Sequence, residues 1–179
     1  MNLRRPLHRP LQVARHLLAL AHEAASLTRL VPPPGSAGRR RLRELGASPA
    51  LIDAFTRAHP ADRAAAARLA ATLRRAGAAP AEQFAALIHD LPKGRAGLPS
   101  RVLHVLLGSP QSETWPGDDA SSLARLRGHA AEAPRLAARL GAPLEVVQIL
   151  EALAAQERDG TAVDARAARI FAADSGEAR

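Results

Sequence analysis

Cysteine and tyrosine are missing from this chain of 179 residues, and aromatic residues make up only 2 % of it. Without cysteine there are no disulfides, thiolate metal ligands or cysteine nucleophiles. So few aromatic rings provide no platform for stacked bases, which argues against single-strand nucleic-acid binding. No apolar run reaches the roughly 18 residues that a membrane-spanning helix needs. The sequence therefore predicts no transmembrane segment.

Lysine is nearly absent as well, because Lys93 is the single lysine among 25 basic residues. The net charge is +8 and the isoelectric point about 11.5. This charge is typical either of attraction to polyanions or of a composition biased toward arginine and alanine. Since charge alone does not identify a partner, no specific nucleic acid is predicted.

The first 27 residues, MNLRRPLHRPLQVARHLLALAHEAASL, begin with basic residues and continue with an apolar part. That part is interrupted by Arg15, His16, His22 and Glu23. A secretory signal has an uninterrupted apolar region, so we expect a cytoplasmic protein.

Segments that alternate polar and apolar residues over the length of a strand do not occur, and valine, isoleucine and threonine are scarce. The apolar residues instead recur at helical spacing, which predicts an all-α fold. Ser48 and Pro49 form a helix start, Pro60 and Gly77 flank another helix, and Pro134 predicts a kink or interruption. The expected helices cover residues 10–30, 48–58, 59–77, 79–91, 98–108, 123–141, 142–156 and 163–174.

The stretch VPPPGSAG, residues 31–38, is predicted to be a linker, because three prolines and two glycines do not continue a helix. It divides the chain into an N-terminal helix with its linker, residues 1–38, and a helical domain, residues 39–179. The apolar stripe of the first helix is expected to pack on its own domain or to form a homo-oligomer. A membrane surface is the alternative.

The stretch FAALIHDLPKG, residues 84–94, places His89 and Asp90 at the end of an apolar helix that Pro92 terminates. On the last expected helix, Asp174 follows Ile170 and Phe171 by four and three residues, on the same face. A carboxylate on an apolar face is expected to be paired or bound to a cation. Convergence of the histidine with the two aspartates would suit Mn, Fe, Mg or Zn.

This pattern resembles the HD-domain superfamily of metal-dependent phosphohydrolases, which are all-helical. The family motif often reads LLHD-x-GK, and ALIHDLPKG matches it with Lys93 in the lysine position. The pair Ala173-Asp174 matches a later Ala-Asp of the family, and His129 matches one of two intervening histidines. The resemblance covers about residues 48–175 and implies an HD-like helical bundle after an N-terminal amphipathic extension.

Three family positions differ in this chain. The first metal-binding histidine of the family falls on or near Ala65, the second intervening histidine falls near Leu153, and the glycine of the motif is Pro92. His59 lies six residues before Ala65, which is about 240° of rotation away on a helix. It therefore does not replace the missing ligand.

Two functions follow from these residues. In the first, the resemblance implies a weakened metal-dependent phosphohydrolase, with His89, Asp90, Asp174 and His129 as ligands of a divalent ion. Asp90 would also act in catalysis, with Lys93 contacting the phosphate of a nucleotide or other phosphoester. In the second, the chain is an inactive relative that binds a nucleotide, a protein partner or an anionic surface. The remaining histidines have no expected role in the site: His104 is expected to be structural, and His8, His16 and His22 to be polar positions of the first helix.

Overall fold

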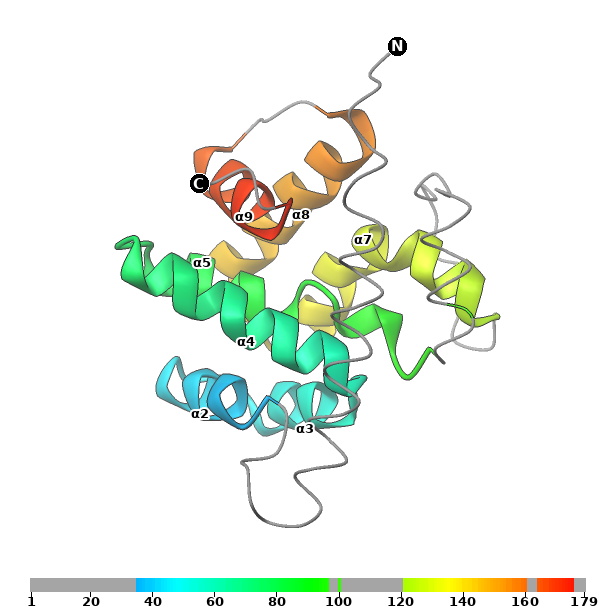
Figure 1. Cartoon of the computed structure of the whole chain (residues 1–179), viewed down its shortest axis with the longest axis horizontal. Coiled ribbons are helices and arrows are strands. Elements are labelled where there is room, and N and C mark those ends of the chain that lie inside the picture. The colour runs from blue at the N-terminus through cyan, green and yellow to red at the C-terminus, as the bar shows by residue number, and fades with distance from the viewer. Residues whose placement is uncertain (1–34, 97–99, 101–120, 161–163, 176–179) are drawn as a thin grey trace.

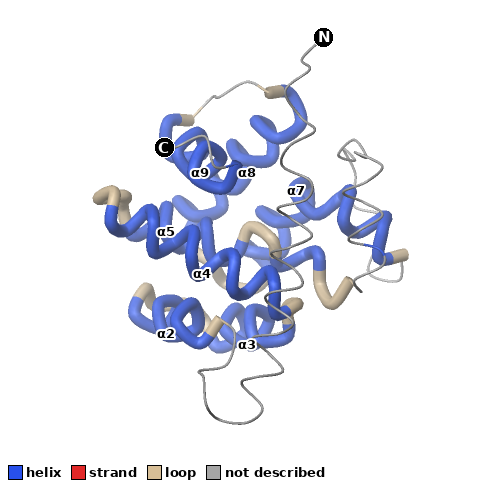
Figure 2. Tube along the Cα trace, in the orientation of Figure 1, coloured by secondary structure: helices blue, strands red, loops and turns tan. Residues whose placement is uncertain are grey.

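The computed structural model describes residues 35–96, 100, 121–160 and 164–175, and these parts of the chain are helical without any strand (Figure 2). The all-α prediction is therefore confirmed for them. The helices are α2 (Ser36–Glu44), α3 (Pro49–Arg57), α4 (Pro60–Arg75), α5 (Pro80–Ile88), the 3-10 turn η1 (Leu91–Lys93), α7 (Ser122–Arg139), α8 (Leu144–Asp159) and α9 (Ala165–Ser175).

The helices pack around α4 and α5, which lie side by side through the middle of the molecule (Figure 1). Helices α2 and α3 cover one side of α4. Helices α8 and α9 pack against each other and against α5, and α7 packs on both α8 and η1. This arrangement brings η1, at the centre of the chain, against a helix that begins about thirty residues later.

The sequence signals at the helix ends are confirmed. Ser48 Oγ accepts a hydrogen bond from the Leu51 amide at 3.2 Å, and Pro49 opens α3. The same hydroxyl donates to the Leu140 carbonyl at 2.5 Å, which fixes the start of α3 to the end of α7. Gly77 follows α4 with φ +76°, a left-handed conformation that glycine adopts without strain.

A single core joins these helices. Its α8 stripe is the predicted one: Val146, Ile149, Leu150 and Leu153 are all buried. The largest fully buried side chains come from six helices and are Phe55, Leu42, Leu51, Leu73, Leu87, Ile88, Ile149, Leu150, Ile170 and Val146. Helix α7, one of the expected helices, runs from Ser122 to Arg139 with Pro134 inside it. Of the two predicted effects of Pro134, the interruption is therefore wrong and the kink stays a prediction.

The predicted linker ends earlier than expected, because α2 already begins at Ser36. Gly38, which we placed in the linker, is a buried residue of that helix. A Cβ atom on Gly38 would lie 2.7 Å from the Phe55 ring and 3.2 Å from Leu87. Glycine therefore lets α2 pack closely against its neighbours, and the sequence pattern alone does not reveal such a contact.

Several predictions concern residues outside the described parts of the chain. They are the N-terminal helix and its role in packing or oligomerisation, the helix over residues 98–108, and the positions of His8, His16, His22 and His104. Within the described ranges, no helix combines the length and apolar character that crossing a membrane requires.

Candidate functional site

Asp90 lies where α5 changes into the 3-10 turn η1. His89 is the C-cap of α5, and Pro92 sits inside η1, where it lacks the amide proton that a continuing α-helix needs. Side chains three residues apart are eclipsed in a 3-10 turn. The side chain of Lys93 is therefore brought over that of Asp90, and its Nζ lies 2.7 Å from Asp90 Oδ1.

Two imidazoles approach the same carboxylate oxygen. His89 Nδ1–H donates to the Ala86 carbonyl at 3.0 Å, and its Nε2 lies 3.3 Å from Asp90 Oδ1. His129, on α7, repeats this arrangement: its Nδ1–H donates to the Leu126 carbonyl at 2.9 Å, and its Nε2 lies 3.4 Å from Asp90 Oδ1. Because each carbonyl orients its ring, both Nε2 atoms are directed at Asp90.

The four residues His89, Asp90, Lys93 and His129 form what we call the Asp90 cluster. Its histidines are buried, and the side chains of Asp90 and Lys93 are only 14 % and 20 % exposed. In the structure, the expected residues His89, Asp90, Lys93 and His129 lie together. They come from the α5–η1 junction and from α7, which are far apart in the sequence.

Within the cluster, Asp90 favours the charged forms of His89 and Lys93, and each of them favours the charged form of Asp90. Burial disfavours the charged form of each group, yet the attraction between groups is stronger. For Asp90 the neighbours His89, Lys93 and His129 bring the pKa well below its usual value. The Asp90 carboxylate, with other nearby acids, raises the pKa of His89 above 6.5 and that of Lys93 above 10.5 despite their burial. Lys93 and Asp90 are therefore a buried ion pair rather than two neutral groups.

Further carboxylates surround the cluster. Asp62, Asp174 and Glu157 act on it through their charge: the first two help to raise the pKa of Lys93, and the last two help to raise that of His89. Sequence reasoning missed Asp62, a buried residue in the first turn of α4. Its signal was its position one helical turn before Ala65, on the same face.

Asp174 is more exposed than predicted. We expected it on the buried face of the last helix with Ile170, but only Ala167 and Ile170 are buried in α9 and Asp174 is exposed. It lies in the last turn before Ser175, where the helix ends and water reaches its side chain. Its charge still acts on His89, so it belongs to the outer, solvated side of the cluster.

The two residues that stand at implied metal-ligand positions, Ala65 and Leu153, supply no ligand. Ala65 is a half-buried residue of α4, and Leu153 is 4 % exposed within the core stripe of α8. Neither side chain has an atom that binds a metal. Of the ligands that the resemblance implies, the described structure brings His89, Asp90 and His129 together around one oxygen atom.

The residues of the cluster do not fit a divalent ion as they stand. Among the described residues, no group of three or more histidine, aspartate or glutamate side chains is arranged to hold a metal ion. The nearest cation to Asp90 is instead the ammonium of Lys93. A metal at this carboxylate would have to displace Lys93 or to bind beside a like charge.

Comparisons of this chain with family models, with curated proteins and with solved structures gave no significant match.

Proposed function

We propose that this chain is an HD-like helical domain in which the Lys93 ammonium replaces the metal ion, and that it acts as a binding domain rather than as a metal-dependent hydrolase. The observation that carries the proposal is the 2.7 Å contact between Lys93 Nζ and Asp90 Oδ1. The 3-10 turn supports it, because its geometry holds the two side chains together without a ligand.

Electrostatics favour lysine over a metal at this position. Two like unit charges about 4 Å apart repel by roughly 4 kcal/mol at an effective dielectric constant of 20, and a divalent ion doubles this. Losing ligands also weakens metal binding, since even changes around a ligand commonly cost about 10- to 100-fold in affinity. Ala65 and Leu153 remove two ligands of the implied set. The ammonium of Lys93 and the missing ligands at Ala65 and Leu153 thus both lower the affinity for a metal ion.

A second candidate function is a weakened metal-dependent phosphohydrolase that acts on a nucleotide or other phosphoester. The arrangement of the two histidines favours it. Metal-binding histidines usually donate their second ring N–H to a carbonyl or carboxylate, and His89 and His129 both do so. Their Nε2 atoms then point at one carboxylate oxygen, as ligands of a shared ion would.

The resemblance implies a phosphorylated small molecule or nucleotide as the ligand, and for the binding domain a protein partner or an anionic surface is the alternative. Within the Asp90 cluster the carboxylate already pairs with the Lys93 ammonium, and Asp62 and Asp174 add negative charge nearby. An anionic ligand would therefore find its positive partners outside the cluster, on the arginines near η1.

Metal content separates the two functions. We would purify the parent protein, Lys93→Ala and the double variant Lys93→Ala/Asp90→Asn, incubate each with zinc or manganese, remove loosely bound ions and measure the metal by elemental analysis. The proposal predicts no stoichiometric metal in the parent, a gain in Lys93→Ala because the competing ammonium is gone, and loss of that gain in the double variant.

The opposite result would support the hydrolase. One equivalent of metal in the parent, removed by Asp90→Asn alone and accompanied by metal-dependent cleavage of a generic phosphomonoester, would contradict the binding-domain proposal. The variant Arg135→Ala is a suitable control, because Arg135 is exposed on α7 and lies outside the Asp90 cluster.

A further inference from the structure

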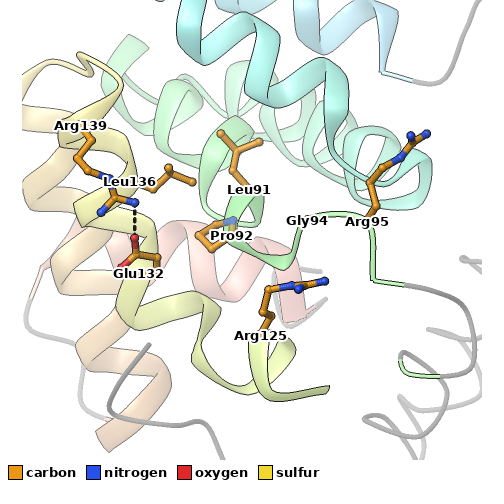
Figure 3. Close-up of a pocket in the computed structure, with 8 residues that line it drawn as sticks. All are labelled: Leu91, Pro92, Gly94, Arg95, Arg125, Glu132, Leu136 and Arg139. Carbon is orange, nitrogen blue, oxygen red and sulfur yellow. Dashed lines mark hydrogen bonds and ion pairs between the residues drawn. The ribbon is translucent and has the colours of Figure 1, made fainter. Parts of the chain in front are cut away.

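A pocket lies beside the Asp90 cluster, between η1 and α7 (Figure 3). Its volume is about 260 Å³, and Leu91, Pro92, Gly94, Arg95, Arg125, Glu132, Leu136 and Arg139 line it. Small-molecule sites usually start near 300 Å³, so the pocket suits a small ligand. None of these side chains belongs to the Asp90 cluster.

The spacing of residues on α7 creates the pocket. Arg125, His129, Glu132, Leu136 and Arg139 are separated by four, three, four and three residues, which places them on one helix face. That face packs on η1. His129 contributes to the Asp90 cluster, and the four other residues extend along the face on either side of it.

The lining combines positive charge with an apolar wall. Three arginines face one glutamate, which leaves a net charge of +2, while Leu91, Pro92 and Leu136 supply the apolar surface. In Figure 3, Leu91 and Pro92 lie between the Arg139–Glu132 pair at one end of the pocket and Arg125 at the other. A guanidinium offers donors in a planar fork that matches the oxygens of a phosphate or carboxylate.

Arg139 is held in place at its end of the pocket. Its Nη2 lies 2.5 Å from Oε1 of Glu132, a side chain that is only 5 % exposed, whereas the Arg139 side chain is 57 % exposed. Glu132 therefore anchors the guanidinium and uses only part of its donors. Arg95 lies at the rim, where its exposed side chain points away from Leu136 in Figure 3.

The geometry points to this pocket as a binding site for a small organic oxyanion, a phosphate or carboxylate group on a compact apolar body. One α7 arginine contacts the oxyanion, because Arg125 and Arg139 lie at opposite ends of the pocket, and Leu91, Pro92 and Leu136 contact the apolar part. This inference deepens the proposed function and rests on it for the class of ligand, and its test needs neither a metal nor the Lys93–Asp90 pair.

The test is a binding titration by calorimetry with phenyl phosphate, in EDTA and at fixed ionic strength. Inorganic phosphate, benzoate and phenol are the comparison ligands. We expect phenyl phosphate to bind more tightly than inorganic phosphate, because only the former uses the apolar wall, and we expect no measurable binding of phenol. Benzoate identifies the oxyanion: weaker binding than phenyl phosphate assigns a phosphate, and tighter binding assigns a carboxylate.

Variants locate the ligand. The variants are Arg125→Gln and the pair Glu132→Gln/Arg139→Gln, which avoids a buried unpaired carboxylate. The one that removes the contacting arginine should weaken binding about tenfold, the loss typical of one charged hydrogen bond, and no loss in either would overturn the inference. Arg135→Gln, an exposed arginine on the same helix, should leave the affinity within about twofold if charge alone is not the cause. Circular dichroism would verify that each variant is folded.

Two other results would overturn the inference. Equal weakening by Arg135→Gln, or phenol binding as tightly as phenyl phosphate, would show that the pocket does not recognise an oxyanion. Loss of binding in Lys93→Gln with no effect of the pocket variants would place the ligand at the Asp90 cluster. The titration is done in EDTA, so it does not depend on a metal ion. Metal found in the parent protein by the separate elemental analysis would contradict the proposed function and leave the result of this titration unchanged.

Discussion

Replacing Lys93 with methionine removes the cation of the Asp90 cluster while keeping most of its volume. Removing one partner of a buried ion pair usually costs about 3–5 kcal/mol. The Lys93 and Asp90 side chains are 20 % and 14 % exposed, and two imidazoles also lie within 3.4 Å of the carboxylate. We therefore expect a smaller loss in the free energy of unfolding, roughly 2–3 kcal/mol at pH 8.5.

The loss should be smaller at pH 6. Lys93 is one of the charges that lower the pKa of His89, so its removal raises that pKa further. The folded variant then binds more protons than the folded parent and gains stability relative to it as the pH falls. Protonated His89 takes over as the partner of Asp90.

A double-mutant cycle in urea measures this coupling with the parent, Lys93→Met, Asp90→Asn and the double variant. The double variant should lose less than the sum of the single losses, because removing both partners leaves no unpaired charge, and we expect a coupling of about 1–2 kcal/mol. Arg135→Met controls for loss of an exposed cation on α7. A coupling below about 0.5 kcal/mol would refute the description of Lys93 and Asp90 as a buried ion pair.

Three other changes have expected outcomes. The pKa of His89 is raised in the folded protein. Its contribution to stability is therefore present in full below the unfolded pKa of about 6.5 and is lost as the pH rises through the folded pKa. Over this pH range, urea unfolding should show the parent losing more stability than His89→Gln. Gly38→Ala should destabilise by about 1–3 kcal/mol in thermal unfolding, because the new Cβ would lie 2.7 Å from the Phe55 ring and outweigh the better helix propensity. Asp62→Asn should lower the pKa of Lys93, measured by NMR, because the Asp62 carboxylate is one of the charges that raise it; an unchanged pKa would show that Asp62 does not act on the cluster.

Local signals were sufficient to predict most of the described helices. Proline at the first helical position, a serine cap at Ser48 and the glycine after α4 are short-range features, and they determine where α3 and α4 begin and end. The apolar stripe of α8 was also predicted correctly, because burial repeats with the helical period. Contacts between helices were not predicted from the sequence. Gly38 is a buried residue of α2, where a Cβ atom would meet Phe55 of the next helix.

In the site, too, single residues were predicted from the sequence and their contacts were not. His89 and Asp90 stood out as polar residues inside an apolar run, and His129 was identified by the resemblance. That Lys93 contacts a substrate phosphate stays a prediction. Its contact with Asp90 was not predicted, since the 3-10 turn that brings the two together was not foreseen. Asp62 was overlooked for a related reason: its nearness to Lys93 depends on how α4 packs against the rest of the bundle.

The central claim, that Lys93 is the cation of Asp90, is tested most directly on Lys93 itself. Because the chain has a single lysine, protein labelled with ¹³C at lysine Cε gives one side-chain resonance to follow. The account predicts a pKa above 10.5 in the parent, a decrease in Asp90→Asn, and no change of the resonance when one equivalent of zinc is added. A pKa at or below 10.5 that Asp90→Asn leaves unchanged, with zinc shifting the resonance, would contradict it and would indicate that the cluster is a metal site.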